Sequence, residues 1–210
     1  MSEQKNGVIR TYYNEDQTKL STERFIFNGK NEGECITYYH DDSPHSICNY
    51  KNDKKEGEYI KYYDNGKIWE ISNYKNSKKE GEYKLYYYNE KIWEISNYKN
   101  DLCDGKFMTY CSSGNLRREY NYKEYKLEGE CKEYYQNGQL WKIYNCINGW
   151  REGKYMEYDK NNKLKITCNY KDGKIDQKTY QIHNYKDGNF INEYKEYHDN
   201  NNDSRKRKKE

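Results

Sequence analysis

The sequence has no alanine and a single proline, and only 27 of its 210 residues are leucine, isoleucine, valine or phenylalanine. Without alanine, the best helix former, a helical protein is disfavoured. So few aliphatic side chains in a chain with 35% charged residues usually indicate disorder. Two features argue against disorder: the net charge is only +3, and there are 28 tyrosines and 4 tryptophans. Aromatic and β-branched residues favour strands, so the composition predicts an all-β protein.

The sequence also lacks long apolar runs. The first ten residues contain no apolar stretch of the kind found in secretory signals. No segment approaches the roughly 18 apolar residues of a membrane-spanning helix. The seven cysteines do not recur at one repeat position, which favours reduced, buried thiols over a disulfide framework. We therefore expect a cytoplasmic protein that is not secreted.

Positive charge gathers at the C-terminus. The last ten residues hold five basic and two acidic side chains, and the preceding 200 residues carry equal numbers of each sign. A neutral array is a poor electrostatic footprint for nucleic acid, so nucleic acid is not an expected partner. The basic run could be a nuclear-targeting signal, a contact for anionic lipid, or a disordered solubilising end. Its residues are Arg205, Lys206, Arg207, Lys208 and Lys209.

Glycines recur with a fixed period of 24 residues. They are Gly33, Gly57, Gly81, Gly105, Gly129 and Gly153. The clearest copy reads GEYIKYYDNGKIWEISNYKNSKKE from Gly57, and a close copy follows it directly. A fixed period of this size indicates a repeat architecture in which each unit contacts mainly its neighbours. Such an array presents an extended surface, which suits binding better than catalysis.

Each repeat is predicted to be a β-hairpin. Asn65-Gly66 lies between two apolar segments, and this dipeptide is the strongest short signal for a type I′ turn. A two-residue turn there places Lys61 opposite Glu70. Three repeats later, the equivalent pair has the two charges exchanged. The same register places Tyr62 opposite Trp69.

This register predicts a purely apolar face with one tyrosine and one tryptophan in each central repeat. Its aromatic members are Tyr62, Trp69, Tyr86, Trp93, Tyr134 and Trp141. We expect Trp69 and Trp93 to be covered by neighbouring repeats. Trp150 falls in the turn between repeats, at the position that Lys54 and Lys78 fill elsewhere, and we expect it to be exposed.

The residue types that carry chemistry form no convincing site. Cys35, His40, His45 and Cys48 resemble a zinc-binding spacing, but zinc needs convergent ligands. The register places Cys35 directly opposite Cys48 on one face and turns His45 to the other. An acidic residue precedes almost every repeat glycine, as a solvated edge would require. No nucleophile-elbow, metalloprotease or phosphate-loop pattern occurs. We therefore expect no enzyme activity, no metal, no cofactor and no small-molecule substrate.

The repeat resembles the MORN repeat family in its longer variant form, over nearly the whole chain. The residues that carry the resemblance are Gly57, Tyr59, Tyr62, Tyr63, Asn65, Gly66, Ile68 and Tyr74, with their equivalents in other copies. The resemblance implies β-hairpin repeats in an elongated, twisted antiparallel sheet with an aromatic groove. It also implies roles as protein-interaction scaffolds, with membrane association often proposed, and similarity to bacterial antitoxin-like proteins.

The sequence thus predicts an all-β array of about seven 24-residue hairpins and a partial one over residues 7–200. A short lead, residues 1–6, precedes it, and a basic disordered tail, residues 201–210, follows it. The expected function is a non-enzymatic scaffold that binds a protein partner through an extended aromatic-rich face. The alternative is association with an anionic membrane surface through the array and the basic tail.

Overall fold

The computed structural model describes residues 6–186 and 189–195. These residues form strands and turns only, so the all-β prediction is confirmed. None of them lies in a helix that could cross a membrane. The basic run 205–209 and most of the predicted lead lie outside the described residues. The chain divides into two compact units, Met1–Gly114 and Asn115–Glu210, a division that the repeat pattern did not predict.

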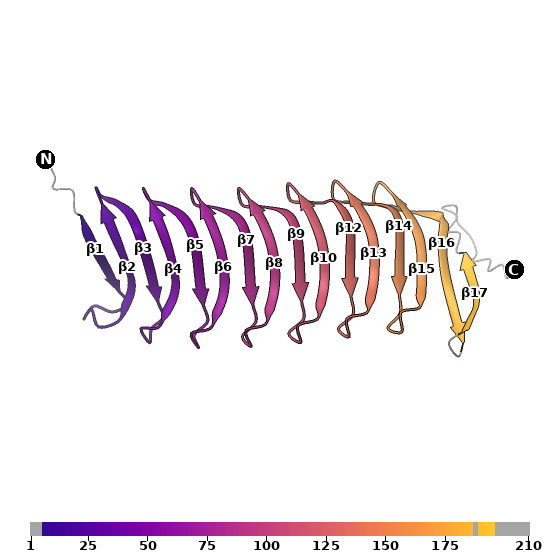
Figure 1. The fold of residues 1–210 in the computed structure, drawn as a ribbon, viewed down its shortest axis with the longest axis horizontal. Helices are drawn as coiled ribbons and strands as arrows, with labels where there is room; N and C mark the ends of the chain where they lie inside the picture. Colours follow the sequence, from indigo (N-terminus) through magenta and orange to yellow (C-terminus); the bar gives the residue numbers. More distant parts are fainter. Residues whose placement is uncertain (1–5, 187–188, 196–210) are drawn as a thin grey trace. The chain divides into compact units, whose positions relative to one another are not determined.

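In each unit the strands follow one another in sequence order and run antiparallel to their neighbours (Figure 1). The first unit contains β1 (Gly7–Tyr12), β2 (Leu20–Phe27), β3 (Lys30–Tyr38), β4 (Pro44–Lys51), β5 (Lys54–Tyr62), β6 (Ile68–Lys75), β7 (Lys78–Tyr86), β8 (Ile92–Lys99) and β9 (Leu102–Tyr110). The second unit contains β10 (Leu116–Lys123), β11 (Lys126–Leu127), β12 (Gly129–Tyr134), β13 (Leu140–Ile147), β14 (Trp150–Tyr158), β15 (Leu164–Lys171), β16 (Lys174–Lys186) and β17 (Asn189–Lys195). The predicted hairpin repeats are therefore present in both units.

Two kinds of turn alternate along the chain, and the type I′ turn predicted at Asn65-Gly66 is found between the repeats instead. The turns between repeats, such as Asn52-Asp53 and Asn76-Ser77, have positive φ at both central residues, which defines type I′. At Asn65-Gly66 only the glycine has positive φ, at 77°, and its amide donates to the Tyr63 carbonyl at 3.0 Å. This is a three-residue loop that ends in a left-handed residue. Asn-Gly fits both loops, so the dipeptide alone could not separate them.

The longer loop is followed by a β-bulge at the tryptophan position. Lys61 lies opposite Glu70, as predicted, but Tyr62 lies opposite Ile68, and Trp69 is the extra residue. The Trp69 ring stacks on Tyr63 with 5.8 Å between ring centroids. The Lys61 ammonium nitrogen lies 4.1 Å from the centre of the same ring. Strand residues alternate between the two sides of the sheet, so Lys61 and Tyr63 lie on the side away from Tyr62. Trp69 contacts Lys61 and Tyr63, so the prediction that Trp69 shares a face with Tyr62 is wrong.

Five of the acidic residues that precede repeat glycines have a structural role that the prediction of a solvated edge missed. The Glu56 carboxylate accepts a hydrogen bond from the backbone amide of Asn76, in the next type I′ turn, at 2.9 Å. The same contact recurs for Glu32 with Asn52, Glu80 with Asn100, Glu128 with Asn148 and Glu152 with Asp172. Each carboxylate thus satisfies a turn amide of the following repeat.

Tyrosine hydroxyls link successive repeats at the other end of the strands. Tyr63 donates to the backbone carbonyl of Tyr86 at 2.7 Å, and this carbonyl lies one repeat ahead. The same bond joins Tyr39 to Tyr62, Tyr87 to Tyr110 and Tyr135 to Tyr158. The tyrosine-rich composition therefore reflects a bond that each repeat makes to the next, in addition to strand propensity.

Replacing Tyr63 with phenylalanine should lower the free energy of unfolding by about 1 kcal/mol, since it removes the part-buried hydrogen bond from the Tyr63 hydroxyl to the Tyr86 carbonyl. The control is Tyr62→Phe, because the Tyr62 hydroxyl makes no hydrogen bond within the described residues. Urea unfolding of both variants measures the difference. Equal midpoints for the two variants would show that the hydroxyl link does not hold the repeats together.

Candidate interaction surface

The register gives each unit two faces of different character. One face, here called the core face, carries Tyr59, Lys61, Glu70 and Ser72 and their equivalents in other repeats. The buried side chains among the described residues lie on this face and are mostly cysteines, serines and tyrosines: Cys131 and Ser96 are fully buried, and Tyr144 and Tyr155 are 6% exposed. The face predicted to be buried was the other one, so that prediction is wrong.

The core face is covered by its own side chains. Lys79 places its ammonium nitrogen 4.0 Å from the centre of the Tyr83 ring and 5.4 Å from that of Tyr98. Arg151 lies over the rings of Tyr144 and Tyr155 in the second unit. A cation over an aromatic ring is attracted by the ring's negative face, and its aliphatic stem covers apolar surface. A lysine or arginine at this repeat position therefore closes the face against solvent.

Burial keeps the core-face phenols and most of its thiols protonated. It raises the pKa of Tyr74 to about 12, that of Cys103 to about 11 and that of Cys131 to about 12. A nucleophile needs a lowered pKa or an adjacent base. These groups therefore have the properties of packing residues.

Cys35 and Cys48 lie directly opposite each other on β3 and β4, as the sequence predicted. Their thiols are free, and a hydrogen bond from Cys48 lowers the pKa of Cys35 while that of Cys48 is raised. His45 occupies the bulge position, and its ring contacts Thr37 and Tyr39. Because Thr37 is on the core face, the prediction that His45 points to the opposite side is wrong. Among the residues described, no three His, Cys, Asp or Glu side chains gather closely enough to hold a metal ion.

The second face, here called the isoleucine face, bears a row of mainly apolar side chains across strands β3 to β9 of the first unit. In the cross-strand register each member lies opposite the next: Ile36, Ile47, Ile60, Ile71, Lys84, Ile95 and Met108. Lys84 is the one polar member, and it forms an ion pair with Glu82. A second row beside it pairs tyrosines with isoleucines, as in Tyr62 with Ile68 and Tyr86 with Ile92. All these side chains are half-buried.

The tryptophans predicted for this face are elsewhere. Trp69 and its equivalents in the bulges, Trp93 and Trp141, contact the tyrosines that lie just before the hairpin loop. Trp93 is 41% exposed, so it is less covered than predicted. Trp150 is 65% exposed, as predicted. The aromatic members that remain on the isoleucine face are the tyrosines at the position of Tyr62.

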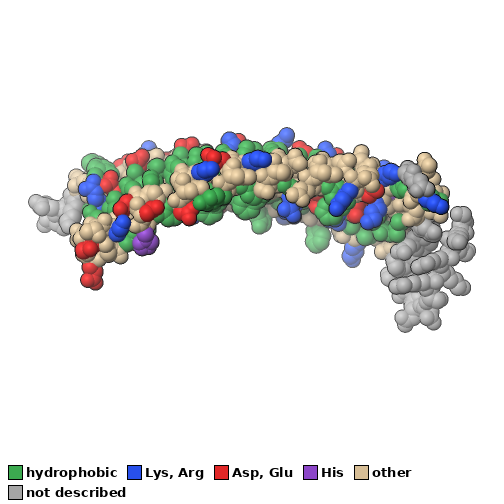
Figure 2. All heavy atoms as spheres, turned by 90° about the horizontal axis from the view of Figure 1, so that it is seen from below, with side chains coloured by type: hydrophobic (Ala, Val, Ile, Leu, Met, Phe, Trp, Pro, Cys, Tyr) green, Lys and Arg blue, Asp and Glu red, His purple; other side chains and the backbone are tan. Residues whose placement is uncertain are grey.

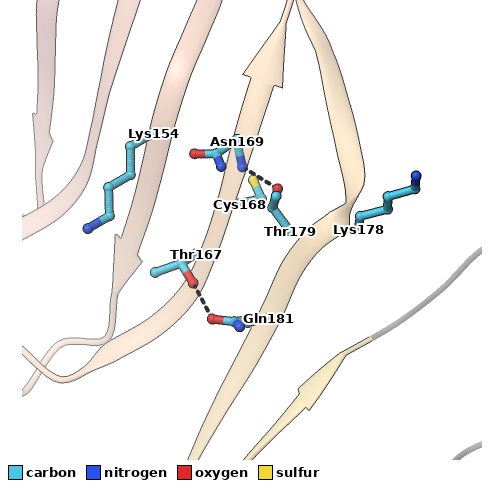
Figure 3. Close-up of a pocket in the computed structure, with 7 residues that line it drawn as sticks. All are labelled: Lys154, Thr167, Cys168, Asn169, Lys178, Thr179 and Gln181. Carbon is cyan, nitrogen blue, oxygen red and sulfur yellow. Dashed lines mark hydrogen bonds between the residues drawn. The ribbon is translucent and has the colours of Figure 1, made fainter.

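In the second unit the equivalent row is more polar, and the face is hollowed. Lys132, Ile143, Met156, Thr167 and Gln181 follow one another across its strands. A hollow of ≈ 320 Å³ lies on this face. Figure 3 shows the residues that line it, where the Thr167 hydroxyl donates to Gln181 and the backbone amide of Asn169 donates to Thr179. Lys154 and Lys178 extend away from one another in this view. Because the two cations do not converge, the hollow has no built anion site.

Burial raises the pKa of the Glu94 carboxyl on the core face, and a hydrogen bond from Ser96 opposes the shift. A raised pKa means that the folded state favours the protonated form, so ionised Glu94 destabilises the protein at neutral pH. We expect Glu94→Gln to raise the melting midpoint at pH 7 by up to about 4 °C, or about 1 kcal/mol. The gain should fade as the pH falls through the folded pKa of Glu94. Glu58→Gln, at an exposed carboxylate, should leave the midpoint unchanged, and an equal rise would exclude burial as the cause.

The seven thiols should all react with an alkylating reagent after unfolding without reductant, provided that the cell extract is prepared anaerobically. Zinc should be well below one equivalent in protein purified without added metal, because the ligands of the predicted constellation do not converge. Mass spectrometry and elemental analysis measure the two quantities. Stoichiometric zinc, or a disulfide between Cys35 and Cys48, would contradict this expectation.

Comparison with known proteins identifies the repeats. The family model described as MORN repeat variant matches residues 31–52, 55–76, 79–100, 127–148 and 151–172. None of the curated proteins matches this chain. Among solved structures, one chain of the structure titled "Crystal Structure of TcdB2-TccC3-Cdc42" is similar to this protein, with 10% sequence identity. The match covers 89% of this protein but only 12% of that chain. Its TM-score of 0.24 is too low to support an argument. The five in-register matches cover more than half of the sequence, and the chain belongs to the MORN repeat variant family.

Proposed function

We propose that this protein is a non-enzymatic scaffold that binds a protein partner through the isoleucine face of its first unit. The observation that carries the proposal is the apolar row from Ile36 to Met108, which crosses seven consecutive strands. At about 4.8 Å per strand the row is roughly 29 Å long. Within the described residues of the first unit, no second layer of strands or helices covers it. Rows of half-exposed apolar side chains of this length usually mark an interaction site.

The contrast between the two faces supports the choice. The core face has cations over its aromatic rings and buries its thiols, so the free apolar surface on this side is mainly that of the bulge tryptophans, such as Trp93. The isoleucine face adds tyrosines, and tyrosine is enriched in residues that dominate binding energy. The second unit has the polar residues Thr167 and Gln181 in the equivalent row, so its face is less suited to an apolar partner.

A matched pair of double variants tests the proposal. Ile60 and Ile71 lie opposite each other in the row, and Met156 and Thr167 lie opposite each other at the equivalent positions of the second unit. We expect the double variant Ile60→Lys, Ile71→Lys to capture at least about tenfold less of the native partner, because two charges would be buried in the complex without partners of opposite charge. Met156→Lys with Thr167→Lys should capture as much partner as the unmodified chain.

Quantitative mass spectrometry of material captured from the native cell measures this ratio, with circular dichroism as the check that each variant folds. If both variants capture partners as the parent chain does, the isoleucine face is not the binding surface. If both lose them equally, the effect is not specific to the first unit.

The alternative function is association with an anionic membrane surface. It is supported by the basic run Arg205–Lys209, which lies outside the described residues. Flotation with anionic vesicles separates the two functions. Salt-sensitive flotation that disappears on deletion of residues 201–210 would favour the membrane, whereas no flotation would leave the cytoplasmic scaffold, our proposal, as the better account.

A further inference from the structure

Two of the seven cysteines form a cluster on the core face that the proposed function does not use. Cys35 on β3 lies directly opposite Cys48 on β4, and both thiols are free. Four other hairpins have at most one thiol at these two positions. Their pairs are Tyr59 with Ser72, Tyr83 with Ser96, Cys131 with Tyr144 and Tyr155 with Cys168.

The register places Cys35 and Cys48 within reach of a disulfide bond. Directly opposed residues of an antiparallel pair have Cα atoms about 4.5–5.5 Å apart, and a disulfide joins residues whose Cα atoms are about 4.4–6.8 Å apart. The Cys48 thiol already donates a hydrogen bond to the Cys35 sulfur, so the two sulfurs are in contact. A bond between them therefore needs little movement of the backbone.

An arginine lies on the other side of Cys35. Arg24 on β2 is directly opposite Cys35, and its Nε atom is buried and makes no hydrogen bond within the described residues. A buried polar atom without a partner costs free energy, and such an atom calls for an explanation. Small residues take the place of Arg24 in the next three pairs of neighbouring hairpins. These residues are Cys48, Ser72 and Ser96.

These surroundings favour the thiolate form of Cys35. The hydrogen bond from Cys48 lowers the pKa of Cys35 most, and the positive charges of Arg24 and Lys55 lower it further, while burial opposes them. The pKa of Cys48 is raised, because its thiol donates that hydrogen bond. Burial raises the pKa of Cys103 as well. A thiolate is the reactive form of cysteine, so Cys35 is suited to attack and Cys48 keeps its proton.

The pair is accessible only to small molecules. Cys35 is 8% exposed and Cys48 is 5% exposed. Within the described part of the first unit, no second layer of strands or helices covers the core face. Figure 2 views the molecule from the side of the hairpin loops and shows hydrophobic side chains at the surface between charged ones. An oxidant the size of hydrogen peroxide therefore reaches the Cys35 sulfur more readily than a bulky reagent does.

We propose that Cys35 and Cys48 are a site of reversible oxidation, where a hydroperoxide oxidises Cys35 and Cys48 then closes a disulfide bond. The inference is independent of the proposed function, because both thiols lie on the core face. In a reducing compartment the pair remains as two thiols, which is also the form expected in an anaerobic extract. Oxidation would tie β3 to β4 beside Ile36 and Ile47, the first two members of the apolar row.

The reaction has two steps. In the first, the Cys35 thiolate attacks a peroxide oxygen, so that a sulfur–oxygen bond forms and the oxygen–oxygen bond breaks. The leaving oxygen takes up the proton that Cys35 released and departs as water or an alcohol. In the second, the Cys48 sulfur attacks the sulfenic sulfur of Cys35 and hydroxide leaves, taking the Cys48 proton to become water. The two thiols lose two electrons in total, and the peroxide gains two.

Treatment of the full chain with hydrogen peroxide gives the first test. After alkylation of the remaining thiols and digestion without reductant, mass spectrometry should find the Cys35 and Cys48 peptides joined and two hydrogens lighter. Dithiothreitol should separate them.

The chain contains its own control for this test. Cys131 and Cys146 are also in contact, but Cys131 lies opposite Tyr144, so the two cysteines are diagonal neighbours. Diagonal neighbours are about 7–8 Å apart, which is too far for a disulfide without backbone movement. Linkage of Cys131 to Cys146 at an equal rate would overturn the inference. So would the absence of a Cys35–Cys48 link at a dose that oxidises the methionines.

Single variants test the roles of the two thiols. Cys48→Ser should leave the sulfenic acid of Cys35 without a thiol to react with, and dimedone should label it. This variant should fold, because Ser72 and Ser96 occupy the equivalent positions. Cys35→Ser should leave Cys48 largely unlabelled. Equal labelling of Cys48 in Cys35→Ser and of Cys35 in Cys48→Ser would contradict the assignment of Cys35 as the attacking thiol.

Variants of Arg24 test the role of the neighbouring cation. Arg24→Met should form the disulfide about three- to tenfold more slowly, because less of Cys35 is then thiolate. Arg24→Lys, which keeps the charge, should retain most of the parent rate. Melting midpoints show whether each variant is folded at the temperature of the assay. An Arg24→Met variant that reacts as fast as the parent would exclude Arg24 from the site.

Discussion

Each unit of this protein is a single layer of strands, and this constraint shapes the whole molecule. Most sheets bury one face against a second layer, which supplies the apolar surface that stabilises them. Here the described residues of a unit provide no such layer, so side chains of one repeat must cover those of the next. Two hydrogen bonds link neighbouring repeats in this way. The Tyr63 hydroxyl donates to the Tyr86 carbonyl, and the Glu56 carboxylate accepts from the Asn76 amide.

The same constraint accounts for the composition. A small side chain such as Ser72 is 1% exposed because large rings and long cationic stems surround it on the core face. Tyrosine, lysine and arginine can cover a neighbour and keep a polar end in contact with water or a hydrogen-bond partner. Leucine and valine are not needed, so a chain with few aliphatic residues still folds. The isoleucines of the row in the first unit are the exception, and they lie on the face that the chain itself leaves partly open.

Much of the fold could be predicted from the 24-residue period, which gave the hairpins, the pairing of Lys61 with Glu70 and of Cys35 with Cys48, and the exposure of Trp150. Which face is buried could not be predicted, because in a single layer of strands the burial of a residue depends on the size of neighbouring side chains rather than on hydropathy. The side taken by Trp69 depends on a bulge, and one inserted residue reverses a two-residue alternation without changing the composition. The division after Gly114 falls in a stretch, residues 101–126, that the family model does not match, where Cys111 and Arg117 replace the usual tyrosine and tryptophan.

The central claim is that the core face is closed by the chain itself and the isoleucine face is left for a partner. Hydroxyl-radical footprinting of the full chain at a concentration low enough for monomers tests it most directly, because residues of one type can be compared across the two faces. Tyr62 and Tyr86, on the isoleucine face, should be oxidised faster than Tyr83 and Tyr155, on the core face. Equal oxidation of all four tyrosines in the dilute protein would contradict the account.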